Sequence, residues 1–458
     1  MQKYLFKNIS VVNEGKIYIS DVLIQKGRIE KIAPVINLKE NAAEINGEGK
    51  HLLPGIIDDQ VHFREPGLTH KGDIYSESKA AIAGGVTSYM EMPNTVPNAL
   101  TGQLLEEKYF IASKNSLANY SFFMGAANDN SDEVLRMNDK RKKICGIKIF
   151  LGSSTGNMLV NNINTLSRIF SESELLIATH CEDENIIRAN YQKIKAEKKE
   201  LSPADHPLIR DVNACFTSSS DAIALANKYG SRLHILHIST GKEPSLFDKN
   251  IPLLQKKITA EVCVHHLHFT ADDYERLGYL IKCNPAIKSA DNKEALWKAL
   301  LDDSFDIIAT DHAPHTIEEK QGPYEHAHSG LPLVQHSLSI MLHYCNECNT
   351  EQGRISLTNI VKKMSHSVAD CFMVEERGYI REGYFADLLV VDLKRKSRIS
   401  KQDLLYKCGW SPLEGEIFPR SVVQTFVNGN CVYTSLGDNE NSTVWDESMR
   451  GERLLFKR

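Results

Sequence analysis

The most constraining feature of this chain is a series of eight short apolar stretches, separated by longer and more polar spacers. The stretches are rich in β-branched and aromatic residues, whereas spacers such as residues 73–84 and 183–199 carry apolar residues at helical spacing. Eight strands that alternate with helices predict a (β/α)8 barrel of the TIM type. The eight predicted strands cover residues 51–58, 86–93, 120–126, 145–152, 175–181, 232–239, 258–266 and 305–312.

The two flanks of this region have a different pattern. Near the N-terminus, short runs of alternating apolar and polar residues are separated by the turn pairs Glu14-Gly15 and Lys26-Gly27, and a similar pattern with Asn428-Gly429 returns near the C-terminus. We therefore expect an α/β protein in which both termini build one small β-sandwich domain beside the barrel. The expected bounds are residues 54–373 for the barrel domain, and residues 1–53 together with 374–458 for the β-sandwich.

Length and composition exclude several classes of protein. A chain of 458 residues is long enough for a barrel of about 250 residues and a second, smaller unit. Its formal net charge of -5 and the lack of a basic stripe argue against a nucleic-acid partner. The N-terminus lacks the apolar core of a signal peptide, and no stretch approaches the roughly 18 apolar residues of a membrane span. We therefore expect a soluble, cytoplasmic protein without a membrane partner.

The ten cysteines are scattered and do not form a disulfide or zinc-finger pattern. Several lie inside apolar runs, as Cys145, Cys181 and Cys263 do, where a reduced thiol behaves as a small apolar residue. The single pair Cys345-Asn346-Glu347-Cys348 has no second pair to complete a metal site. The cysteines therefore fit the reduced thiols of a cytoplasmic protein.

Residues with metal-ligand chemistry follow four of the predicted strands, at the barrel end where this fold places its catalytic residues. Each of them alone has an ordinary interpretation as a polar residue at a strand end. Imidazoles and a carboxylate that converge from four strands, however, are what a hydrolytic divalent metal needs. Lys148 is a fifth candidate, because a lysine inside the apolar run Gly146-Ile147-Lys148-Ile149-Phe150 is costly to bury without a partner. The four strand-end candidates are His62, His180, His237 and Asp311.

The segment Asp58-Asp59-Gln60-Val61-His62-Phe63-Arg64 adds a fixed cation to this set. Residues two apart in an extended strand project to the same face, so Gln60, His62 and Arg64 should point toward one pocket. This motif, and the order of the metal-ligand candidates after it, resemble the amidohydrolase superfamily and, within it, the dihydroorotases. The resemblance covers roughly residues 54–330 and extends into both flanks. It has one departure, because Gln60 stands where the family usually has a histidine.

The resemblance implies an activity, the reversible zinc-dependent interconversion of (S)-dihydroorotate and N-carbamoyl-L-aspartate in pyrimidine biosynthesis, and a homodimer. In the family, the lysine that matches Lys148 is carboxylated and bridges two zinc ions. The aspartate that matches Asp311 transfers the proton between the attacking water and the leaving amide nitrogen. The implied zinc ligands are His62, Lys148, His180, His237 and Asp311, and the implied substrate-binding residues are Arg64, Asn94, Asn284 and His315.

The departure at Gln60 makes that residue a doubtful metal ligand, since a neutral amide oxygen binds zinc more weakly than imidazole does. We therefore expect one tightly held zinc and a second that is labile or absent. Residues 316–330, which are rich in Glu, Gly and His, predict a loop over the site.

Two other functions stay open. An allantoinase or a dihydropyrimidinase would use the same metal centre, although Arg64 suits the carboxylate that dihydroorotate carries. A non-catalytic, dihydroorotase-like partner of aspartate transcarbamoylase would account for the lost histidine at Gln60. It would leave the retained buried Lys148 and the convergent histidines without a role.

Overall fold

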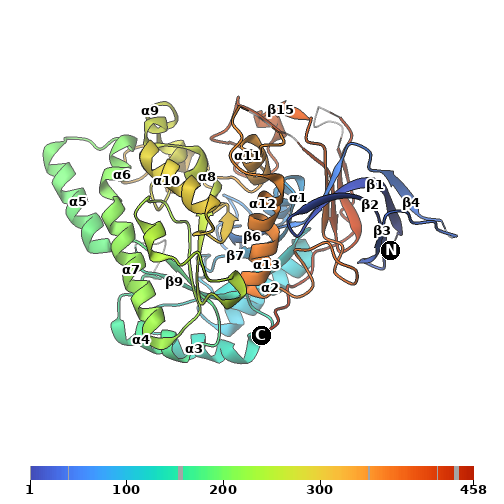
Figure 1. Ribbon diagram of the computed structural model, residues 1–458. Helices are drawn as coiled ribbons and strands as arrows, with labels where there is room; N and C mark the ends of the chain where they lie inside the picture. The colour runs from blue at the N-terminus through green and yellow to red at the C-terminus, as the bar shows by residue number, and fades with distance from the viewer. Residues whose placement is uncertain (1, 40, 153–157, 349–350, 420, 438–442) are drawn as a thin grey trace.

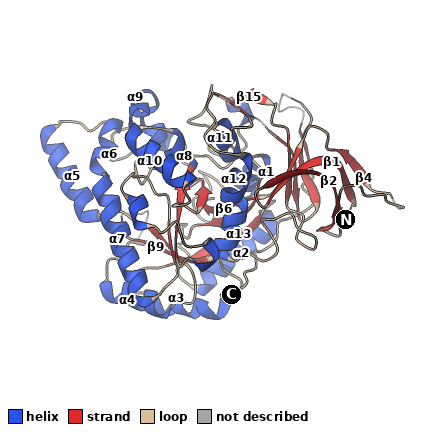
Figure 2. Ribbon diagram, viewed as in Figure 1, coloured by secondary structure: helices blue, strands red, loops and turns tan. Residues whose placement is uncertain are grey.

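The computed structural model describes residues 2–39, 41–152, 158–348, 351–419, 421–437 and 443–458. A barrel surrounded by helices occupies the middle of the chain, and a sheet in which the blue N-terminal and red C-terminal strands meet lies beside it (Figure 1). Figure 2 shows the same division by secondary structure, with the helices outside the barrel strands. The predicted TIM-type barrel is confirmed, and the β-sandwich domain predicted from both termini is present as a separate sheet domain.

Eight parallel strands form the barrel, and each pairs with its neighbours in chain order. The first and last strands meet through a bridge between Val61 and His312, where the His62 backbone N–H donates to the His312 carbonyl oxygen over 2.7 Å. Nearly every strand residue is buried, as expected for parallel strands covered by helices. The strands are β6 (Ile56–Val61), β7 (Val86–Glu91), β8 (Asn119–Gly125), β9 (Gly146–Phe150), β10 (Ile177–His180), β11 (Leu233–Ile235), β12 (Ile258–Cys263) and β13 (Ile307–Ala309).

The first predicted barrel strand, residues 51–58, is divided between the two parts of the molecule. Its first half, β5 (His51–Pro54), pairs with β14 (Leu388–Val391) in the terminal sheet, and the barrel strand begins only at Ile56. Gly55 joins the two halves, and a side chain there would collide with Thr87. An apolar run gives no sign of such a division, because both halves are largely buried. The other seven predicted stretches each overlap one barrel strand.

Capping residues explain where several helices begin or end. α1 (Ile74–Ala83) begins after Asp73, which forms a capping box with Ser76. α5 (Glu184–Glu197) begins after Asp183, whose carboxylate accepts from two backbone N–H groups of the first turn. α7 (Val212–Tyr229) ends at Gly230, which takes the left-handed conformation of a helix C-terminus. The other α-helices are α2 (Gly102–Asn115), α3 (Ser131–Arg136), α4 (Ile163–Glu172), α6 (His206–Ile209), α8 (Val264–His268), α9 (Tyr274–Leu277), α10 (Ala290–Leu301), α11 (Ser337–His343), α12 (Leu357–Val361) and α13 (Ser367–Phe372).

The terminal sheet joins strands from both ends of the chain in one hydrogen-bonded network of nine. β5 joins the N-terminal and C-terminal strands of this sheet, because it pairs with β1 on one edge and with β14 on the other. Phe6, Leu52 and Phe426 pack in its core. The remaining strands are β1 (Tyr4–Asn13), β2 (Lys16–Gln25), β3 (Arg28–Ala33), β4 (Ala43–Asn46), β17 (Val422–Val427), β18 (Asn430–Ser435) and β19 (Thr443–Trp445), and a separate pair is formed by β15 (Lys396–Arg398) and β16 (Ile417–Pro419).

The last residues of the chain, 451–458, return from the terminal sheet to the barrel. The Leu454 N–H donates to the Tyr120 carbonyl oxygen, and the Arg458 guanidinium donates to the Cys145 carbonyl oxygen over 2.7 Å. These contacts lie at the N-terminal ends of β8 and β9, away from the end where this fold carries its chemistry. Within the described ranges, no helix combines the length and the apolar character needed to span a bilayer.

Candidate active site

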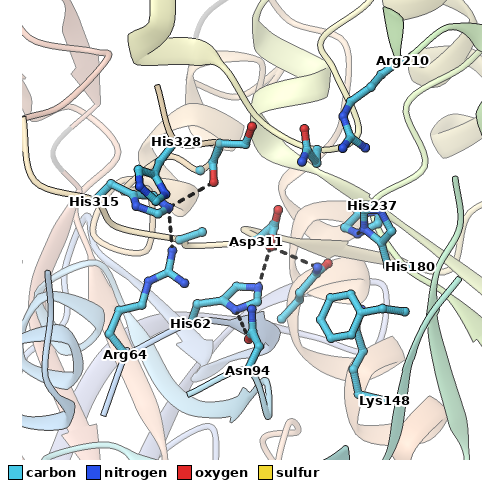
Figure 3. Close-up of a pocket in the computed structure, with 16 residues that line it drawn as sticks. His62, Arg64, Asn94, Lys148, His180, Arg210, His237, Asp311, His315 and His328 are labelled. Carbon is cyan, nitrogen blue, oxygen red and sulfur yellow. Dashed lines mark hydrogen bonds and ion pairs between the residues drawn. The ribbon is translucent and has the colours of Figure 1, made fainter. Parts of the chain in front are cut away.

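A cavity of about 280 Å³ lies at the C-terminal ends of the barrel strands. In Figure 3 the labelled side chains reach it from opposite sides, with Asp311 between Arg64 and His62 on one side and His180 and His237 on the other. All ten residues that the sequence predicted for a site line this one cavity. They are Gln60, His62, Arg64, Asn94, Lys148, His180, His237, Asn284, Asp311 and His315.

Three of these residues have a backbone conformation that few side chains adopt. The φ angles of Arg64, His237 and Asp311 are +70°, +40° and +47°, in the left-handed region where a side chain crowds its own backbone. Each residue follows a barrel strand by no more than three positions. Such conformations persist where the surrounding structure holds them in place, and they are concentrated at functional sites.

His62 and Asp311 form the first of two pairs in the cavity. His62 Nε2 lies 3.2 Å from Asp311 Oδ1, and His62 Nδ1 lies 2.8 Å from the side-chain oxygen of Asn94. Burial lowers the pKa of His62 despite the nearby carboxylate. Burial alone would raise the pKa of Asp311, but the neighbouring groups, first among them His62 and then His265 and Lys148, outweigh it, so this pKa lies below its usual value. Asp311 is therefore an ionised carboxylate in a buried site.

His180 and His237 form the second pair. His180 Nδ1 lies 2.9 Å from His237 Nε2, and the other nitrogen of His180, Nε2, lies 3.0 Å from Glu182 Oε2. Glu182 also forms an ion pair with Arg210. Burial would raise the pKa of Glu182, yet Arg210 and His180 together hold it at about 2. Burial lowers the pKa values of both histidines, so their imidazoles are neutral and one is backed by an anionic carboxylate.

Lys148 lies in β9 and is almost completely buried, with 1% of its surface exposed. Its ammonium nitrogen lies 4.5 Å from the centre of the Phe150 ring, and among the described residues no carboxylate lies within ion-pair distance of it. Burial lowers the pKa of Lys148 to about 8, against the opposing charges of Asp311 and Glu261. The cost of burying this lysine, anticipated from the sequence, is thus present in the structure.

Gln60 lines the cavity and donates a hydrogen bond to Asp311. Its side-chain N–H donates to Asp311 Oδ1 over 3.1 Å, while its side-chain oxygen faces the Cys263 thiol at 3.9 Å. An amide N–H group is a donor and cannot bind a cation. In this arrangement Gln60 orients Asp311 rather than offering an oxygen to the same space.

Arg64 occupies the side of the cavity opposite His180. Its Nε donates to the Pro314 carbonyl oxygen over 3.0 Å, and its Nη2 lies 3.1 Å from His315 Nε2. Lys71 supports this group from behind, because its ammonium lies 3.2 Å from His315 Nδ1 and 3.0 Å from Glu319. Burial lowers the pKa of Arg64 to about 10, so the guanidinium keeps its charge near neutral pH.

The predicted loop over the site, residues 316–330, contributes one wall of the cavity through His328, Ser329 and Gly330. Lys320 fixes this segment, since its buried ammonium donates to the carbonyl oxygens of Lys282, His328 and Gly330 over 2.8–3.0 Å. His328 also stacks on His315, with ring centres 4.8 Å apart.

Among the cavity residues that were not predicted from the sequence, two have ionisable side chains, Arg210 and His328. A signal existed for the partner of Arg210: Glu182 lies two residues after His180, a spacing that often brings two side chains to one side of the chain. Arg210 itself follows the short helix α6, and its partner lies 28 residues away, so no local pattern could identify it. His328 lies in an irregular segment without periodicity.

Residues 51–432, which include the whole barrel, match the model of the amidohydrolase family. The chain belongs to the amidohydrolase family. It is 31% identical to the dihydroorotase of Pyrococcus abyssi, over 96% of each chain. It is also 31% identical to the dihydroorotase of Carboxydothermus hydrogenoformans, over 94% of this chain and 97% of the relative. Among solved structures, the L-hydantoinase (dihydropyrimidinase) from Arthrobacter aurescens superposes with a TM-score of 0.88 at 27% identity, covering 94% of this chain and 96% of that one.

Amidohydrolases generally use a metal, and the donor groups of this amidohydrolase fit a divalent cation. If His62 Nδ1–H donates to Asn94, the lone pair of His62 Nε2 faces the Asp311 carboxylate, and two acceptors at 3.2 Å repel each other unless a cation lies near both. If His180 Nε2–H donates to Glu182, the lone pair of His180 Nδ1 likewise points toward His237. Neutral imidazoles and a carboxylate are the ligands that zinc prefers.

Proposed function

We propose that this amidohydrolase is a dihydroorotase, which interconverts (S)-dihydroorotate and N-carbamoyl-L-aspartate in pyrimidine biosynthesis. The observation that carries the proposal is the buried, charged Arg64 in the wall of a cavity that also holds the imidazole pairs. A cyclic amide with a carboxylate matches such a cavity, because one end needs a fixed cation and the other needs an activated water. The relatives named dihydroorotase, matched over nearly the whole chain, support the same choice.

Arg64 is suited to hold a carboxylate. A guanidinium has five N–H donors in a rigid fork, and the protein groups Pro314 and His315 take up only part of them. A planar carboxylate accepts two parallel hydrogen bonds from such a fork. Asn94, His315 and Asn284 line the same cavity, and we propose that the first two complete the carboxylate site while Asn284 contacts the ring.

The residues proposed to hold zinc are His62, His180, His237, Asp311 and, once carboxylated, Lys148. Zinc bound there would acidify a water molecule and polarise the ring carbonyl group. Carboxylation of Lys148 would replace a buried ammonium that has no ion pair among the described residues by an anionic group. Asp311, ionised and hydrogen-bonded by Gln60, is the base that takes the proton of the attacking water and returns it to the leaving ring nitrogen.

A hydantoinase or dihydropyrimidinase activity is the second candidate. The structural likeness to the Arthrobacter aurescens L-hydantoinase (dihydropyrimidinase) supports it, since the two chains superpose over almost their full lengths. Hydantoin and dihydrouracil carry no ring carboxylate, so they would leave the Arg64 guanidinium without its anionic partner. The two candidates therefore differ in how strongly the activity depends on Arg64.

Initial rates with dihydroorotate, hydantoin, dihydrouracil and allantoin, at measured metal content, test this proposal. We expect the highest kcat/KM for dihydroorotate. Arg64→Met should raise the KM for dihydroorotate by roughly 30- to 150-fold, which corresponds to about 2–3 kcal/mol for a lost charge-assisted contact. Any activity toward hydantoin should change little in this variant. A higher kcat/KM for a substrate without a carboxylate would make the second candidate correct, and no turnover of any substrate by metal-loaded protein would favour a non-catalytic role.

A further inference from the structure

A second group of metal-ligand side chains lies next to the cavity, where β12 continues into α8. The Cys263 thiol and one ring nitrogen each of His265 and His266 lie within 4.8 Å of one another. All three side chains are buried, with exposed fractions of 0%, 1% and 2%. The group is separate from the His180–His237 pair and has no part in the proposed hydrolysis. We call it the β12 cluster.

The β12 cluster contains buried nitrogen atoms whose hydrogen-bonding capacity is unused. Within the described residues, Nδ1 of His266 has no hydrogen-bond partner, and the ring of His265 has none beyond the backbone of Thr310. His266 Nε2 lies 3.1 Å from the Pro285 carbonyl oxygen, so it carries the proton and leaves a lone pair on Nδ1. Buried polar atoms without partners are rare in folded proteins and each calls for an explanation. A cation that accepts these lone pairs would supply one.

The surroundings of the β12 cluster supply further donor atoms for a cation. Cys263 lies between the side-chain oxygen of Gln60 and the carboxylate of Glu261, each 3.9 Å from its sulfur. Burial, and after it the carboxyl groups of Glu261 and Asp311, raise the pKa of the Cys263 thiol, so the thiol keeps its proton until a bound metal displaces it. Burial lowers the pKa of His265 to about 4, so its imidazole is a neutral donor.

We propose that Cys263, His265 and His266 bind a divalent transition metal such as zinc, with the side-chain oxygen of Gln60 as the fourth donor. In a tetrahedral zinc site with bonds of about 2.0–2.3 Å, ligand atoms lie about 3.5 Å apart, so the three groups need to approach by about 1 Å. Binding forms one metal–sulfur bond and releases the thiol proton to solvent. The site takes zinc or cobalt rather than magnesium or calcium, because thiolate and imidazole are soft and borderline ligands.

Cobalt(II) tests the β12 cluster, because a bond between Co²⁺ and thiolate gives a charge-transfer absorption band that nitrogen and oxygen ligands do not give. The full-length protein is stripped with a chelator and titrated with Co²⁺, and bound cobalt is counted per chain. We expect the band in the unmodified protein and its loss in Cys263→Ser, with one cobalt fewer per chain. His265→Asn should weaken the titration of the band by at least tenfold.

Cys181→Ser is the matched control, because Cys181 is also a buried thiol near the cavity but donates to Thr179 rather than facing the cluster. The band should persist in this variant. Absence of the band in the unmodified protein, or its persistence in Cys263→Ser, would overturn the proposal. If Cys263→Ser does not fold, X-ray absorption of the unmodified zinc-loaded protein decides: a sulfur neighbour at about 2.3 Å supports the site, and only nitrogen and oxygen neighbours contradict it. The outcome does not depend on which amide is the substrate.

Discussion

The two imidazole pairs of the cavity differ in the groups that stand behind them. Behind His180 lies the anionic Glu182, which is itself held by Arg210, whereas behind His62 lies the neutral amide of Asn94. A carboxylate that accepts the outer N–H of an imidazole fixes its tautomer and makes its other nitrogen a stronger donor to metal. If the cavity holds zinc as proposed, the His180 side should therefore bind it more tightly than the His62 side.

The partners within each pair also favour tighter metal binding on the His180 side. His180 faces a second imidazole, that of His237, at 2.9 Å. His62 faces Asp311, and Asp311 shares its carboxylate with the Gln60 amide. A carboxylate engaged by an amide N–H has less electron density to offer a cation. The cavity thus combines one well-supported pair with one whose side chains are partly occupied by hydrogen bonds, so we expect unequal affinities for the two proposed metal ions.

The largest expected effect comes from Asp311, which belongs to the weaker pair but carries the proposed proton transfer. Asp311→Asn keeps the shape of the side chain and removes the base, so turnover should fall by about 100- to 10,000-fold. The measurement is kcat with dihydroorotate, together with metal per chain. Nearly full turnover with metal retained would show that Asp311 is not the base.

Lys148→Ala should affect both pairs at once, since the proposed carbamate would be shared between them. We expect loss of most bound metal and of activity, with partial recovery when short-chain carboxylic acids are added in place of the carbamate oxygens. Metal analysis before and after acid addition gives the answer. A variant that keeps its metal without added acid would contradict the role given to Lys148.

Glu182→Gln should act on the stronger pair alone. Loss of the anionic partner of His180 should lower metal affinity on that side by about 10- to 100-fold, as expected for a group that orients a metal ligand. Competition with a chelator measures the change. Glu91→Gln is the control, because Glu91 is also a buried carboxylate paired with a cation, Lys108, but is bonded to no imidazole among the described residues. An equal effect in both variants would mean a general loss of stability.

The strand-end pattern predicted much of this cavity but little of what supports it. His62, His180, His237 and Asp311 could be identified because a barrel brings all its strand ends together, whatever the details of its loops. Arg210 and the division of residues 51–58 between two sheets depend on contacts between distant segments, which no local periodicity records. Cys263 looked like a small apolar residue of a strand, and its position opposite Gln60 exists only because the barrel closes.

The smallest expected effect, and the sharpest test of the comparison, comes from Gln60. Gln60→His would place an imidazole beside Asp311 and remove the amide hydrogen bond, so the weaker pair should gain a ligand and an unoccupied carboxylate lone pair. We expect a several-fold gain in affinity for the second metal and little change in the first. The measurement is zinc per chain against chelator concentration, in a Cys263→Ser background so that the β12 cluster does not contribute. Two equally tight metals already present before the change would show that the pairs are equivalent, because the Gln60 amide would then be no obstacle to binding.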